Sequence, residues 1–191
     1  IIVDSVGEDM ALTRVKKVPT ANLVQGSSFL TSVSSSNMPA GTIIQVVRNV
    51  GATQYTNSSS STYLNIADIN TTITPKAANS VLFFQISFQT FKNGMSTGQS
   101  GCEFRLRDHT NSTTIMDYRG VAFQNIASSS QSQDMQYSAF NATTSASNTN
   151  AREYRLEYRR DSTYNLASTV YVGWNLDTNS PQCMVIYEIA Q

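Results

Sequence analysis

Charged side chains are scarce in this chain of 191 residues: they make up 14% of it, against about 25% in an average soluble protein. The 13 lysines and arginines are balanced by 13 aspartates and glutamates, so the net charge is zero. Nonspecific nucleic-acid binding needs a basic surface that displaces counterions from phosphates, and this composition argues against it. It also argues against a polybasic membrane-binding patch.

Long apolar runs and cysteines are also few. The longest apolar stretch, Val81–Phe88, has the length of a strand and is far short of the about 20 residues that span a bilayer. The first residues lack the basic and apolar segments of a signal peptide. Two cysteines, Cys102 and Cys183, are too few for a disulfide framework. We expect both to be small core residues, and a disulfide between adjacent strands stays open.

Uncharged polar residues take the place of the missing charge, since serine and threonine alone are about a quarter of the chain. Glutamate and lysine are rare, whereas β-branched and aromatic residues are plentiful, which favours strands over helices. Strand-like segments follow one another from Thr42 to Ala190 with short polar breaks. The pattern predicts an all-β protein, an antiparallel sandwich or barrel of about 8–10 strands.

Three segments alternate most clearly between apolar and polar residues: Ser80–Phe91, Cys102–Asp108 and Arg152–Arg160. In the last two, charges of opposite sign fill the polar positions, which is typical of a strand with one buried and one solvated face. Lys92–Gly94 is predicted to end the first of these strands, and residues 94–101 are predicted to form a polar loop.

The first 38 residues differ from the rest of the chain. Their apolar residues fit neither the helix nor the strand period, and such a segment buries little surface by itself. We predict that residues 1–38 form an extended attachment arm or linker that orders only against a partner, and that residues 39–191 form a sandwich head. The candidate anchoring residues of the arm are Leu12, Val15, Val18, Leu23 and Phe29.

Residues for catalysis are sparse. The single histidine, His109, lies in a predicted hairpin turn, where we expect an exposed turn residue instead of a catalytic base. A metal held by three such histidines on a symmetry axis stays open as an alternative. The aspartates mostly flank turns, where they bond their own backbone. We therefore predict no enzyme, no metal site and no cofactor.

Aromatic residues beside polar loops are the remaining functional signal. Tyr137, Phe140 and Tyr164 lie close to segments rich in serine, asparagine and glutamine. Aromatic rings stack on sugar C–H surfaces while short polar groups bind hydroxyls, so these three residues are candidate contacts for a carbohydrate. The alternative is that they are core or sheet residues.

One segment after another resembles a known family. Met38–Val47 is similar to the entry into the C-terminal domain of marine bacteriophage fibre and other virion structural proteins. Further segments in matching order resemble the same proteins: Met10–Val15, Thr72–Leu82, Phe104–Asp108 and Met184–Ala190. The resemblance covers residues 10–191. It implies a jelly-roll-like sandwich similar to tumour-necrosis-factor heads, often trimeric, in a virion assembled in the bacterial cytoplasm.

Three functions follow as hypotheses. The first is a homotrimeric fibre or spike head that attaches to the host surface, with the arm docked on other virion proteins and weak single contacts multiplied by valency. The second is a capsid decoration, head-fibre or tail connector protein with no receptor role. The third, least favoured, is a glycan hydrolase, which needs two carboxylates about 5–10 Å apart in a groove.

Overall fold

A computed structural model describes residues 38–125, 134–173 and 182–191. The chain divides into two units between Met38 and Pro39, and the second unit contains all of the described strands. The predicted arm residues Leu12, Val15, Val18, Leu23 and Phe29 lie outside the described residues.

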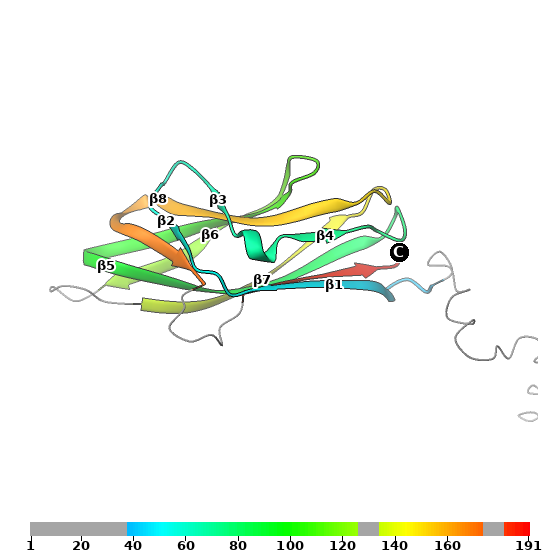
Figure 1. The fold of residues 1–191 in the computed structure, drawn as a ribbon, viewed down its shortest axis with the longest axis horizontal. Coiled ribbons are helices and arrows are strands. Elements are labelled where there is room, and N and C mark those ends of the chain that lie inside the picture. Colours follow the sequence, from blue (N-terminus) through cyan, green and yellow to red (C-terminus); the bar gives the residue numbers. More distant parts are fainter. Residues whose placement is uncertain (1–37, 126–133, 174–181) are drawn as a thin grey trace, which may run out of the picture. The chain divides into compact units, whose positions relative to one another are not determined.

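The described residues form mainly strands, joined by turns, loops and one 3₁₀ turn (Figure 1). In chain order the elements are β1 (Ile43–Gly51), β2 (Tyr55–Asn57), β3 (Leu64–Asn65), η3 (Ala67–Ile69), β4 (Thr71–Ile73), β5 (Val81–Asp108), β6 (Thr113–Asn125), β7 (Asp134–Ser145), β8 (Arg152–Val172) and β9 (Gln182–Ile189). No helix long and apolar enough to cross a bilayer occurs in this part of the chain.

The strands form two packed antiparallel layers, which confirms the predicted sandwich. The first layer has the order β1, β9, the first part of β5, then β7. In the second layer the first part of β8 pairs with β3 and β4 on one side and with the second part of β5 on the other, and β6 follows. Neighbouring strands of the first layer are distant in sequence, whereas β5 and β6 of the second layer form a hairpin. The first and last of the described strands, β1 and β9, pair with each other. This is the arrangement of a jelly roll.

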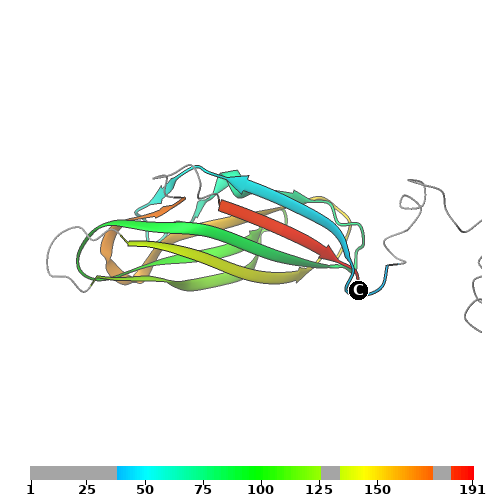
Figure 2. The same ribbon diagram turned by 90° about the horizontal axis from the view of Figure 1, so that it is seen from below.

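β5 belongs to both layers. Its residues 81–92 pair with β7, whereas its residues 98–108 pair with β6. The pairing of β5 with β8 shows register shifts between these two parts, at Met95–Ser100 and Ser100–Cys102. Such bulges bend a strand and increase its twist. Figure 2 shows the strand turning from one layer into the other at the end away from the C-terminus. The predicted break at Lys92–Gly94 and the loop at residues 94–101 are therefore wrong.

Between the layers lies one apolar core, built from the faces that the alternation predicted. Leu82, Phe84, Ile86 and Phe88 of β5 point inward and are buried. They meet the buried side of the second layer, which contains Cys102, Phe104, Leu106, Tyr154, Leu156 and Tyr158. Ring pairs connect the two layers: the centroids of Phe84 and Tyr154 are 4.8 Å apart, and those of Phe88 and Phe104 are 4.4 Å apart.

The two cysteines are free, and they lie in different surroundings. Cys102 is buried in the core, where desolvation, followed by the nearby Glu103 and Asp161, raises the pKa of its thiol well above the usual value. Cys183 is half-buried and lies on the outward side of β9, so its predicted core position is wrong.

A buried carboxylate secures the loop between β4 and β5. Glu188, with no exposed surface, accepts hydrogen bonds from the backbone N–H groups of Lys76 (2.8 Å) and Ala77 (3.0 Å) and from the Ser80 hydroxyl (2.7 Å). Gln45, with its amide nitrogen turned toward this carboxylate, donates to the second oxygen at 3.0 Å. Glu188 thereby attaches the last strand to β1 and to the loop.

Candidate functional site

The outward sides of β8 and of the second part of β5 carry alternating charges, as the sequence predicted. We call this surface the charged outer face; its members are Glu103, Arg105, Glu153, Arg155, Glu157 and Arg159. The charges pair along and across the strands. Arg105 bonds Glu157, Arg155 bonds Glu153 at 2.9 Å, and Arg159 bonds Glu103 at 2.6 Å.

Tyr63 lies on this face because the chain between β2 and β3 is fastened over β8. The Asn57 side chain donates to the backbone carbonyls of Thr62 and Tyr158, each at 3.0 Å. The backbone of Arg160 in turn donates to the Ser59 carbonyl at 3.0 Å. An asparagine that bonds two backbone carbonyls fixes a turn, so the loop that carries Tyr63 is held against the sheet.

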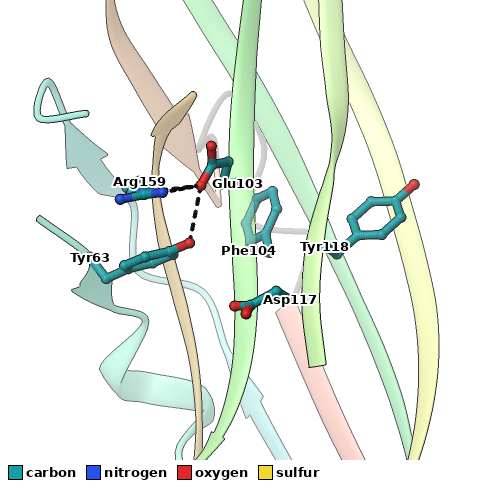
Figure 3. Close-up of a pocket in the computed structure, with 6 residues that line it drawn as sticks. All are labelled: Tyr63, Glu103, Phe104, Asp117, Tyr118 and Arg159. Carbon is teal, nitrogen blue, oxygen red and sulfur yellow. Dashed lines mark hydrogen bonds and ion pairs between the residues drawn. The ribbon is translucent and has the colours of Figure 1, made fainter. Parts of the chain in front are cut away.

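Two guanidinium groups contact the ring of Tyr63. The Cζ atom of Arg105 lies 4.0 Å from the ring centroid and that of Arg159 lies 4.5 Å from it. Both distances are within the range of cation–π attraction. The Tyr63 hydroxyl donates to Glu103 at 3.1 Å, and Arg159 donates to the same carboxylate oxygen (Figure 3).

The pKa values of this cluster reflect its burial and charges. Desolvation raises the pKa of Tyr63, and the neighbouring Glu103 raises it further, while Arg159 opposes both. Burial alone would lower the pKa of Arg159, but its hydrogen bond to Glu103 and its contact with Tyr63 outweigh that cost and raise it. The hydrogen bond that Arg159 donates to Glu103 therefore stabilises the charged form of the guanidinium.

A pocket of about 120 Å³ opens beside this cluster, lined by Tyr63, Glu103, Phe104, Asp117, Tyr118 and Arg159. Figure 3 shows the side chains of Glu103, Arg159, Tyr63 and Asp117 on one side of the β5–β6 pair, whereas Tyr118 points away from them. The volume admits a few ligand atoms. Carboxylate, guanidinium and phenol groups together suit a ligand with hydroxyl groups, because they offer both acceptors and donors.

Two of the three aromatic residues proposed from the sequence, Tyr137 and Phe140, lie on opposite sides of β7. Tyr137 is 71% exposed and points outward from β7. Phe140 lies three residues later and points inward against the core, where it contacts Phe88 (centroids 5.6 Å apart) and stacks on Tyr118 (6.0 Å). The side chain of Tyr164 lies outside the described side chains.

His109 lies in the turn between β5 and β6, as predicted. Its backbone N–H donates to the Glu153 carbonyl at 2.8 Å, and its side chain is half-buried instead of exposed. No group of three or more histidine, cysteine, aspartate or glutamate side chains that could hold a metal ion occurs among the described residues.

Sequence reasoning missed Tyr63 and Asp117. The alternation of charges in Cys102–Asp108 and Arg152–Arg160 did predict that Glu103, Arg105 and Arg159, which contact Tyr63, lie on an outward face. The contact of Tyr63 with residues 40 and 96 positions away depends on the loop closure by Asn57. A serine-rich loop that begins with an asparagine was the available signal, and it predicts a turn without predicting where the turn docks.

Comparisons with known proteins add the following. No family model and no curated protein match the chain. Among solved structures it is similar to particles of infectious bursal disease virus. The Gt strain structure gives 15% identity, a TM-score of 0.36 and coverage of 77% of this chain and 38% of that one. A VP2 subviral particle gives 16% identity, a TM-score of 0.33 and the same coverage.

A third structure, of derived T=1 particles of the same virus, gives 13% identity and a TM-score of 0.35, with coverage of 78% of this chain and 37% of that one. This chain therefore spans less than two-fifths of the length of each of these structures. Likenesses at these scores assign no function to this chain.

Proposed function

We propose that the chain is a structural protein of a bacteriophage virion, and that residues 39–191 form the homotrimeric head of a fibre or spike that attaches to the host surface. The observation that carries the proposal is the ordered series of segments that resemble such proteins. Two of them, Met38–Val47 and Met184–Ala190, overlap β1 and β9, which pair with each other in the sandwich. Residues 1–38 would fasten the head to other virion proteins.

The host contact in this proposal is the pocket on the charged outer face. Asp117, an exposed carboxylate at the pocket, and the Tyr63–Arg159–Glu103 cluster offer polar groups to the hydroxyls of a surface glycan. The contact is placed here because Tyr137 and Phe140 lie on opposite sides of β7 and cannot grip one ligand together. A contact this small is weak singly, and three copies on one fibre multiply it.

The test is binding of the labelled full-length chain to cells of a susceptible bacterial host. We expect Asp117→Asn to lower binding about tenfold, since one charge-assisted hydrogen bond is lost. Thr114→Ala, at an exposed position of the same strand, is the matched control and leaves binding unchanged. Absence of binding to every susceptible host by the unaltered chain would contradict the attachment role.

The alternative function is a capsid decoration, head-fibre or connector protein without a receptor role. The internal pairing of Glu103 with Arg159 and Tyr63 favours it, because these groups already hold the loop to the sheet. Particles that lack the protein would then assemble poorly or lose stability. Particles that assemble normally but fail to attach to cells would exclude this alternative.

Neither function includes a chemical step. Glu103 and Asp117 are the two carboxylates that line the pocket, and a hydrolase would need both. We expect no turnover of host polysaccharide by the unaltered chain. Turnover that disappears in Glu103→Gln or Asp117→Asn would overturn this part of the proposal.

A further inference from the structure

The outward side of the first layer is unusually apolar for a surface. In β1 the exposed residues include Ile43 (53% exposed), Val46 (54%) and Val50 (40%). Further half-buried outward residues come from β5 and β9: Val81, Phe83, Cys183, Val185, Tyr187 and Ile189. We call these nine residues the apolar outer face.

Strand pairing makes these residues contiguous. Val46 pairs with Tyr187, and Tyr187 pairs with Phe83, so one row crosses three strands; the two rings are 5.9 Å apart. A second row crosses the same three strands, because Val50 pairs with Cys183 and Cys183 pairs with Ser87. Contiguous apolar surface of this type on a folded domain marks an interaction site more often than chance exposure does.

Charge is almost absent from the outward side of the described strands of the first layer. Among the outward side chains of β1, residues 81–91 of β5, residues 137–145 of β7 and β9, Arg48 is the one charged residue. The cores of protein interfaces are depleted in charge and enriched in aromatic residues, as here. The charged outer face of the other layer has the opposite character, so the two outer faces of the sandwich are chemically distinct.

We propose that the apolar outer face binds a second copy of this chain. An acidic partner would find a single cation on this face, and a basic partner would find no anion among its described residues, so the occupant must itself be neutral and apolar. Of the two described outer faces of this chain, this face is the one that meets that requirement. This proposal rests on the homotrimer of the proposed function and names the surface through which its chains contact one another. It does not depend on host attachment.

The polar residues of the face also fit a second copy. Arg48, Val185, Gln85 and Asn141 form one row across the layer, with Arg48 on β1 and Asn141 on β7. A copy whose β1 lies over β5 and β7 of its neighbour places Arg48 beside the amide carbonyls of Gln85 and Asn141.

The test is the solution mass of the full chain, measured by light scattering after size exclusion over a range of concentrations. We expect the unaltered chain to form oligomers. Val46→Asp and Val50→Asp should each weaken association by about tenfold or more, because each replaces an apolar side chain of the interface with a carboxylate that is costly to bury. Thr114→Asp is the matched control: it adds the same charge at an exposed position paired with Arg107 on the other layer. It leaves the mass unchanged.

Cys183 gives an independent readout, because it lies on the apolar outer face whereas Cys102 is buried. In the assembled chain we expect its thiol to react slowly with a water-soluble disulfide reagent, and at least about ten times faster in Val46→Asp, as association weakens. Far-UV circular dichroism of each variant must match that of the unaltered chain, and Val50→Asp serves if Val46→Asp fails to fold.

The outcomes separate the two proposals. A monomeric unaltered chain at all concentrations would overturn self-association, whatever the chain does with host cells. Oligomers that persist in both aspartate variants, with Cys183 equally reactive throughout, would overturn this interface while leaving the trimer intact. Loss of cell binding with normal assembly would concern the pocket alone.

Discussion

Removal of the Glu188 carboxylate should be among the most costly single changes in the sandwich. In Glu188→Ala the backbone N–H groups of Lys76 and Ala77 lose their acceptor, while the Ser80 hydroxyl keeps the Ala77 carbonyl at 2.8 Å. Each buried donor left without a partner costs about 1–3 kcal/mol. Because these two amides are only partly buried, and because a buried carboxylate is itself costly to desolvate, we expect a total loss of about 2–4 kcal/mol.

The assay is urea unfolding at one fixed protein concentration, monitored by circular dichroism. The slope of the free energy of unfolding against urea concentration must be the same for the variant and the unaltered chain. Glu188→Gln keeps one carbonyl oxygen for the three donors and should cost about 1 kcal/mol. Glu153→Ala is the matched control. It removes a carboxylate from a partly exposed ion pair with Arg155, and such pairs are worth about 0–1 kcal/mol. A loss in Glu188→Ala no larger than in Glu153→Ala would refute the reasoning.

Three further predictions follow. Phe84→Ala should lower the free energy of unfolding by about 3–5 kcal/mol in the same urea assay, because its ring is fully buried against Tyr154 and little can move into the space; a loss under about 1 kcal/mol would contradict the described core. Gly173→Ala should cost about 1–3 kcal/mol, since φ is +73° and a Cβ would stand 2.0 Å from Gln182 Nε2; an unchanged melting temperature would count against it. The hydrogen bond to Arg155 lowers the pKa of Glu153 in the folded chain, so its stabilising contribution is present at neutral pH and is lost as the pH falls through that folded-state pKa; an acid limb of the stability curve that is identical in Glu153→Gln would contradict it.

Alternation along single strands could be predicted from the sequence. The buried sides of Ser80–Phe91, Cys102–Asp108 and Arg152–Arg160 are as predicted, because a period of two leaves one choice of buried face once the apolar set is known. The same patterns predicted the outward charges that surround Tyr63.

The continuation of β5 through residues 92–101 could not be predicted. Glycine and asparagine there indicate a turn, but the partner strands β6, β7 and β8 supply the hydrogen bonds that keep the segment extended. Cys183 and Phe140 show a similar limit. Which side of a strand faces the core depends on its register with neighbours that are distant in the chain.

The passage of β5 through both layers has a consequence for how the domain unfolds. Since one unbroken strand is hydrogen-bonded to β7 and β9 in one layer and to β6 and β8 in the other, neither layer can separate without breaking the ladder of the other. Amide protons on both sides should then exchange with solvent through the same global opening. The pairing of Val81 with Ser145 and with Ile189 closes long loops, so folding should be slow and all-or-none.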